Sequence, residues 1–251
     1  MIKFVAFLVS IVGILSCKTQ SGTNVAPQDT FNIQIIPDFN GEPLVMYKTY
    51  SLNGKPIQFT RFSFILSRLC DSKSKDNESR QTQFDFSVNT EEASALKGIT
   101  NTIRPYQDNI KNLRLGFGVD SVDNSNPPSL QIATSPLFNG LNYWDAWNSF
   151  IFMKIEGKYD RDGDGIFETP FALHSGGNSS YSEKNYLLDY QNLPLSPNFL
   201  RVQFDINLAK ILNGIDLNVT TQTQKTADLP LMVLMISNLK NALIYKGTFP
   251  N

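Results

Sequence analysis

The stretch LRVQFDINL, Leu200–Leu208, alternates apolar and polar side chains without a break. Every second residue is apolar, and Arg, Gln, Asp and Asn stand between them. Successive side chains of a β-strand point to opposite faces of its sheet, so this pattern predicts a strand with one buried face. A sheet with one buried face packs against a second layer, and this stretch therefore decides the fold class.

Other stretches share this period of two. It runs through residues 31–35, 84–88 and 113–119, whereas FIFMKI at residues 150–155 is apolar on both faces, as in a central strand. Turn-forming residues lie between the stretches, at 53–54, 126–128, 139–140 and 175–177. Many strands separated by such turns predict a mainly β protein, an antiparallel β-sandwich with a few short helices.

Three short helices are predicted, at residues 91–97, 208–213 and 230–243. The first follows Thr90, which suits an N-cap position, and precedes Gly98, which suits the position after a helix. The last begins with Pro, which is favoured at the first helical position, although its two β-branched residues also allow a strand.

The N-terminal residues MIKFVAFLVSIVGILSC have the features of a secretory leader. Lys3 is followed by an apolar run at residues 4–15 that is too short to span a bilayer comfortably. We interpret residues 1–16 as a signal peptide. The ending Leu15-Ser16-Cys17 resembles a bacterial lipobox, which makes Cys17 the predicted lipidation site. An ordinary signal peptide with a chance Cys is the alternative.

Composition and charge bound the remainder of the chain. Residues 17–30 are polar and contain Gly and Pro, so we expect a flexible tether between the lipid and a single domain at 31–249. A hydrophobic content of 41% with 18% charged residues is that of a globular protein. The net charge of −1 and the lack of a basic stripe argue against nucleic-acid binding.

The predicted location is the bacterial cell envelope, where a lipid anchor holds the domain on the side of the periplasm or the cell surface.

The stretch YDRDGDGIFETPF, Tyr159–Phe171, gathers four carboxylates around two glycines. An EF-hand loop takes calcium ligands from positions 1, 3, 5, 7, 9 and 12, with Gly at position 6. The residues that fit are Asp160, Asp162, Asp164, Ile166 through its carbonyl, and Glu168. Position 12 is Phe171 rather than Glu. We predict a partial calcium loop that stabilises a hairpin between strands 149–158 and 166–174. A bare hairpin turn is the alternative.

The two Trp residues and the only His form a second candidate cluster. Trp144 and Trp147 lie in NYWDAWNSFIF, and His174 follows the acidic stretch. If strands 149–158 and 166–174 pair as a hairpin, His174 returns toward residues 148–152, which places it near Trp147 and within reach of Trp144. The alternative is an aromatic core with a hydrogen-bonded His, which is the usual setting of a single His.

A series of short segments follows in order along the chain. They are FNGEPL (39–44), YSLNG (50–54), FSFILS (62–67), LRLGFGVD (113–120), PL (136–137), NYWDAW (142–147), GKYDRDGDG (157–165) and FALHSGG (171–177), with 202–212 and 238–243 at the end. In this order they resemble the MbnP-like family of bacterial periplasmic lipoproteins. The resemblance spans about residues 31–245 and rests on the order of the segments, because each is short.

The resemblance implies an all-β domain that binds copper outside the cytoplasm. It also implies a di-haem MbnH-like partner that oxidises a Trp to kynurenine, which then helps to bind copper. Trp144 or Trp147 would be the modified residue and His174 a ligand, and Met153 would add a thioether for Cu(I). The chain departs from the family pattern in two ways: it has a single His, so it cannot build a multi-His site, and its aromatic segment begins with Asn142 instead of Met.

These observations predict a lipid-anchored extracytoplasmic metal-binding protein that handles copper. The alternative is a calcium-stabilised interaction module without a transition metal, which would meet an outer-membrane transporter or a haem protein through its loops. The chain has no Gly-x-Ser-x-Gly nucleophile elbow, and its clustered acids read better as ligands than as a catalytic pair. We therefore expect a protein that is not an enzyme.

Overall fold

The structure is a computed structural model. It describes residues 31–71, 81–103, 112–189 and 200–250. The predicted signal peptide (1–16) and the predicted tether (17–30), with Cys17, lie outside the described residues.

The described residues form strands joined by short helices and turns. The strands are β1 (Phe31–Phe39), β2 (Glu42–Pro43), β3 (Thr49–Leu52), β4 (Lys55–Asp71), β5 (Thr82–Asp85), β6 (Ile99–Ile103), β7 (Asn112–Phe117), β8 (Tyr143–Trp144), β9 (Ser149–Tyr159), β10 (Thr169–Gly176), β11 (Ser182–Leu187), β12 (Leu200–Asn207) and β13 (Leu243–Pro250). The α-helices are α1 (Glu92–Lys97), α2 (Ser121–Asn124), α3 (Leu208–Ile211) and α4 (Leu229–Ala242). The 3-10 helices are η1 (Phe86–Val88), η2 (Pro128–Leu130), η3 (Asp145–Trp147), η4 (Asn178–Ser180) and η6 (Thr226–Asp228).

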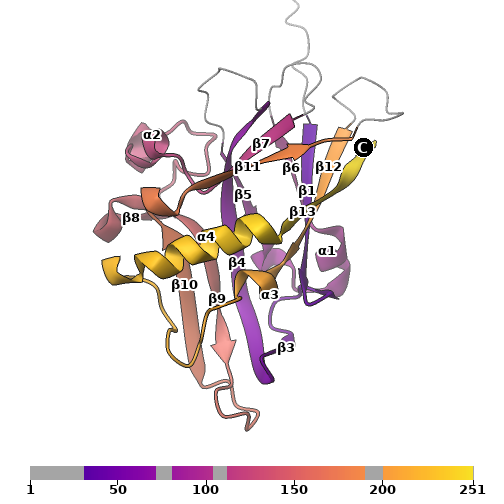
Figure 1. The fold of residues 1–251 in the computed structure, drawn as a ribbon, viewed down its shortest axis with the longest axis vertical. Helices are drawn as coiled ribbons and strands as arrows, with labels where there is room; N and C mark the ends of the chain where they lie inside the picture. Colours follow the sequence, from indigo (N-terminus) through magenta and orange to yellow (C-terminus); the bar gives the residue numbers. More distant parts are fainter. Residues whose placement is uncertain (1–30, 72–80, 104–111, 190–199, 251) are drawn as a thin grey trace, which may run out of the picture.

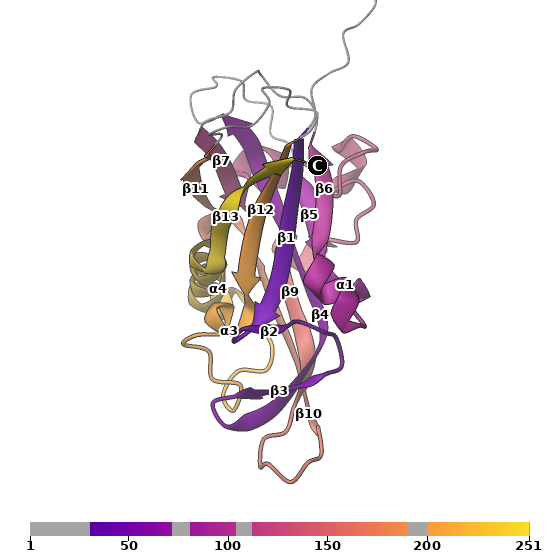
Figure 2. The ribbon, with the colours of Figure 1, turned by 90° about the vertical axis from the view of Figure 1, so that its right-hand side faces the viewer.

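Two sheets form the layers of a sandwich (Figure 2). The smaller sheet has the order β13-β12-β1-β2, with β6 paired to β1. The larger sheet has the order β10-β9-β4-β7-β11, with β3 and β5 paired to β4 and β8 paired to β9. One cluster of buried apolar side chains fills the space between the sheets. The predicted mainly β sandwich is confirmed.

Strand β12 occupies an interior position of the smaller sheet. Its side chains alternate between buried and partly exposed from Leu200 to Asn207, as the sequence period predicts. Phe204 is fully buried, with its ring centroid 5.0 Å from that of Tyr186 and 5.8 Å from that of Tyr245. Strand β12 pairs with β13 in antiparallel fashion and with β1 in parallel fashion. Among the strand pairs of the described residues, this parallel pair is the one departure from the antiparallel pattern.

Strands β9 and β10 form the predicted antiparallel hairpin. Strand β9 is buried along most of its length, as expected of a central strand. The register places Leu173 opposite Ile155, and His174 opposite Lys154. Strand β10 begins at Thr169, three residues later than the predicted start at 166, because the preceding residues wrap around an acidic side chain.

Helices α1 and α4 lie on opposite sides of the two sheets (Figure 2). Helix α4, predicted at 230–243, contacts β10 and β11 of the larger sheet and β12 and β13 of the smaller one (Figure 1). Helix α1 begins after Glu91 rather than Thr90, and no side chain caps it. Gly98 ends that helix with a positive φ, where a Cβ would lie 2.2 Å from the Ile35 carbonyl oxygen. No helix within the described ranges is both long and apolar enough to cross a bilayer.

Truncation of Phe204 to Ala should lower the free energy of unfolding by about 3–5 kcal/mol, because it removes a buried ring from the core. The matched control is Gln203→Ala on the same strand, which should change stability by about 0.5 kcal/mol or less because that side chain is partly exposed. Chemical denaturation measures both variants. Equal losses would contradict the one-sided burial of β12.

Candidate functional site

The two candidate metal sites lie at opposite ends of the β9–β10 hairpin. The acidic loop, residues 160–168, connects the end of β9 to the start of β10. The aromatic site, Trp144, Trp147 and His174, lies where β9 begins and β10 ends. Each site is therefore positioned by the same pair of strands.

Asp160 is the residue around which the acidic loop folds. Its side chain is fully buried, and its two oxygens accept hydrogen bonds from the backbone N–H groups of Gly163 at 2.6 Å and Gly165 at 2.9 Å. Both glycines have positive φ, which lets the chain turn back toward the carboxylate. The Asp160 N–H donates to the Pro56 carbonyl at 3.0 Å, which attaches the loop to β4.

The other three carboxylates of the loop are exposed. Asp162 accepts a hydrogen bond from the backbone N–H of Asp164 at 3.2 Å, and Asp164 accepts one from that of Ile166 at 2.8 Å. Glu168 accepts from the Arg161 N–H at 3.0 Å. Hydrogen bonds from backbone N–H groups, its own and that of Arg161, lower the pKa of Glu168. The loop backbone thus favours the ionised form of Glu168.

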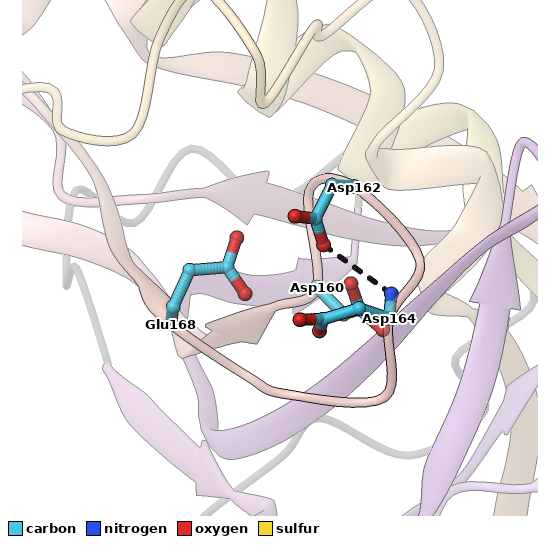
Figure 3. A group of neighbouring side chains, drawn as sticks. All are labelled: Asp160, Asp162, Asp164 and Glu168. Atoms are coloured by element: carbon cyan, nitrogen blue, oxygen red, sulfur yellow. Dashed lines mark hydrogen bonds between the residues drawn. The ribbon is translucent and has the colours of Figure 1, made fainter.

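The four carboxylates converge on one point (Figure 3). One oxygen from each of Asp160, Asp162, Asp164 and Glu168 lies within 4.8 Å of the others. Calcium–oxygen distances of about 2.3–2.6 Å place oxygens on opposite sides of one ion about 5 Å apart, so this set fits a calcium ion. The Lys55 ammonium donates to the Asp162 carbonyl at 3.2 Å and supplies some opposing charge. The role of the Ile166 carbonyl as a ligand stays a prediction.

The two Trp rings of the aromatic site are stacked. Their centroids lie 4.6 Å apart with an angle of 17° between the planes. The Trp147 indole N–H donates to the Gln224 carbonyl at 2.9 Å. Asn148 adopts a left-handed conformation that turns the chain from η3 into β9. The Trp147 ring lies against Gly176 at the end of β10, where an added Cβ would be 3.1 Å from its Cζ3.

His174 lies next to Trp144, whereas the predicted hairpin favours Trp147 as its nearer neighbour. The two rings meet edge to face with centroids 5.9 Å apart. The backbone N–H of His174 donates to the Thr223 hydroxyl at 2.7 Å, and that hydroxyl donates back to the His174 carbonyl. Thr223 belongs to a segment that runs along the free edge of β10, where Ala172 bridges to Gln222. The Thr223 hydroxyl therefore satisfies both the backbone N–H and the backbone carbonyl of His174.

Glu156 is a member of this site that sequence reasoning missed. Its Oε1 lies 2.8 Å from Nε2 of His174 and 3.7 Å from Nη1 of Arg61. Lys154 is buried beside them and donates to the Leu141 carbonyl at 2.9 Å. The signal was available, because Lys154 and Glu156 are two residues apart and share one face of β9. The partner of Glu156 cannot be read from the sequence, because the contact with His174 depends on the register of β9 with β10.

Burial governs the protonation of the site. It lowers the pKa of His174, and the hydrogen bond that the imidazole makes to the Glu156 carboxylate opposes this only in part. Burial also lowers the pKa of Lys154. The Nδ1 atom of His174 is buried and has no hydrogen-bond partner in the part of the chain that the structure describes. The site thus contains an imidazole nitrogen without a partner.

Met153 does not belong to this site, which corrects the predicted ligand set. It pairs with Ser175, whereas the next residue along β9 pairs with His174. Adjacent strand residues point to opposite faces, so the thioether and the imidazole lie on opposite faces of the sheet. Met153 is 1% exposed and packs in the hydrophobic core.

Asp160→Ala should lower the free energy of unfolding in the absence of calcium by about 2–4 kcal/mol, because it leaves two backbone N–H groups without their charged acceptor. Asp162→Ala is the control and should cost less than about 1 kcal/mol, since that exposed carboxylate accepts one backbone hydrogen bond. Thermal or urea unfolding in chelator measures both. A similar loss in the two variants would show that Asp160 does not organise the loop.

Comparisons with known proteins agree with the resemblance in the sequence. The model of the MbnP family matches residues 28–230. Among solved structures, MbnP from Methylosinus trichosporium matches with 12% identity and a TM-score of 0.45, over 80% of this chain and 82% of that chain. No curated protein matches the chain. Because the family model covers more than half of the sequence, the chain belongs to the MbnP family.

Proposed function

We propose that the protein is an extracytoplasmic copper-handling member of the MbnP family that is not an enzyme. Family membership supports a location outside the cytoplasm. A lipid on Cys17 anchors the chain to a membrane of the cell envelope, where it faces the periplasm or the cell surface. The observation that carries the copper proposal is the Nδ1 atom of His174, buried beside Trp144 with no hydrogen-bond partner among the described residues.

The residues of the aromatic site fit copper in part. Imidazole nitrogen is a good ligand for copper, and a buried nitrogen without a hydrogen bond keeps its lone pair for a metal. We favour Trp144 over Trp147 as the residue that is converted to kynurenine, because the Trp144 ring contacts the His174 ring. When bound, copper would give the protein a metal to store or to pass on. The chain's own part is to hold His174 and shield it from water.

The di-haem MbnH-like protein is the proposed partner for the oxidation. Asp145 and Ala146 are exposed between the two partly exposed Trp residues, so a partner can approach this end of the hairpin. Trp and Tyr are favoured as anchors of protein interfaces, which suits NYWDAW as the contact segment. An outer-membrane transporter is the other candidate for this surface.

A second candidate function is a calcium-stabilised interaction module without a transition metal. The convergence of four carboxylates in the acidic loop favours it. Calcium there would stabilise the turn of the hairpin, and the partner would again meet the loops. The two functions are compatible in structure because the sites lie at opposite ends of β9 and β10.

The copper proposal predicts stoichiometric copper and a mass gain that matches kynurenine in protein purified from the native host. Trp144→Phe should abolish the mass gain, whereas the matched variant Trp147→Phe should retain it. His174→Gln should lose copper while it remains folded. Elemental analysis and intact mass spectrometry measure these outcomes. Calcium without copper, together with an unmodified mass, would reject the copper function in favour of the second candidate.

Calcium should raise the melting temperature of chelator-treated protein. At a free concentration about 100 times Kd, binding adds about 2.7 kcal/mol to stability. Glu168→Gln should remove most of this gain, because it takes one carboxylate from the cluster. Asp145→Asn, an equal loss of charge on the exposed η3 turn, is the control and should keep the gain. An unchanged melting temperature in the native sequence would leave the loop as a bare turn.

A further inference from the structure

The contact between Glu156 and His174 determines where the imidazole proton resides. The Oε1 of Glu156 lies 2.8 Å from Nε2 of His174. An ionised carboxylate only accepts hydrogen bonds, so Nε2 must carry the proton that is shared between them. In a neutral imidazole the other nitrogen then has a bare lone pair. That nitrogen, Nδ1, is the buried atom without a partner within the described residues.

The strand register makes this arrangement rigid. His174 is opposite Lys154, and Glu156 is the next residue of β9 on the same face of the sheet. Thr223 binds the backbone of His174 from the other side. The ring of Trp144 meets the imidazole edge to face. The Glu156 carboxylate therefore sets the tautomer from a position that the pairing of β9 with β10 fixes relative to His174.

The charges around the site select against divalent cations with hard ligand preferences. Glu156 is flanked by Arg61 at 3.7 Å and by Lys154 on its own strand. One carboxylate between two basic groups leaves no surplus of negative charge. Calcium and magnesium require several oxygen ligands, usually with carboxylates among them, and the acidic loop at the other end of the hairpin offers those. Imidazole nitrogen suits copper. Cu(I) also brings less positive charge beside Arg61 and Lys154 than a divalent ion would.

We propose that Glu156 is a positioning residue that holds His174 as the Nε2–H tautomer and thereby presents Nδ1 as the nitrogen donor for Cu(I). The assignment rests on the proposed copper function. Beyond copper binding as such, it names Nδ1 of His174 as the ligand atom, Glu156 as the residue that orients the imidazole, and Cu(I) as the preferred ion. Partners of this kind around metal-binding His residues typically change metal affinity by about 10–100-fold when they are lost.

The single His of the chain allows a direct test, because a 15N-histidine label reports on His174 alone. The experiment uses the protein from its native host, labelled in this way, with long-range 1H–15N spectra recorded before and after anaerobic addition of Cu(I). The proposal predicts the Nε2–H tautomer before addition. On addition the Nδ1 resonance should shift, and Nε2 should keep its proton.

Variants at Glu156 separate positioning from folding. Glu156→Gln retains an oxygen acceptor and should keep the tautomer and Cu(I) affinity near those of the native protein. Glu156→Ala should yield a mixture of tautomers and weaken Cu(I) binding by about 10–100-fold. Glu42→Ala, which removes an exposed carboxylate paired with Lys48, is the control and should leave both readouts unchanged. Melting temperatures verify that each variant is folded.

The possible outcomes separate the role of Glu156 from the proposed copper-handling function. An Nδ1–H tautomer in the free protein, Cu(I) bound through Nε2, or unchanged affinity in Glu156→Ala would overturn the role of Glu156 and leave copper handling intact. Failure of Cu(I) to bind at all, with the Nε2–H tautomer present, would overturn the donor role of Nδ1 together with the copper function.

Discussion

The register between β9 and β10 is the constraint on which both candidate sites depend. It places Lys154 opposite His174 on the outer face of the larger sheet, and Met153 opposite Ser175 on the core face. A slip of one residue would exchange the faces, which would bury the imidazole in the core and expose the thioether. The same pairing delivers Asp160 to the turn, where its buried carboxylate closes the loop. One hairpin therefore holds a nitrogen donor at one end and a cluster of oxygens at the other.

The two sites differ in how their buried polar atoms are satisfied. Both oxygens of Asp160 accept backbone hydrogen bonds, so the acidic loop is organised without an ion. Nδ1 of His174 has no partner within the described ranges, and a buried acceptor left this way costs about 1–3 kcal/mol. Such exceptions in a folded protein point to a functional role or an additional ligand. This contrast fits a structural role for the acidic loop and a binding role for the aromatic site.

Local patterns in the sequence predicted the elements, whereas long-range pairing decided the details. The period of two in Leu200–Leu208 predicted β12 and its buried face, but its parallel pairing with β1 depends on the path of the whole chain. The predicted hairpin brings His174 close to the Trp residues, because the pairing of β9 with β10 places the end of β10 beside the start of β9. Trp144 pairs with the start of β9 and contacts His174. The assignment of Met153 to the aromatic site is wrong. In a strand that is apolar on both faces, the sequence does not show which residues face the core and which share the face of His174. The role of Glu156 does not follow from the sequence, because its contact with His174 depends on the register of β9 with β10.

Diffraction from crystals supplied with Cu(I) and calcium, with anomalous data collected on both sides of the copper edge, can locate both ions. We expect a copper peak bonded to Nδ1 of His174, with Nε2 still hydrogen-bonded to Glu156. We also expect an ion without a copper signal among the carboxylates of residues 160–168. The absence of copper at His174, or copper found only in the acidic loop, would contradict the proposed copper site.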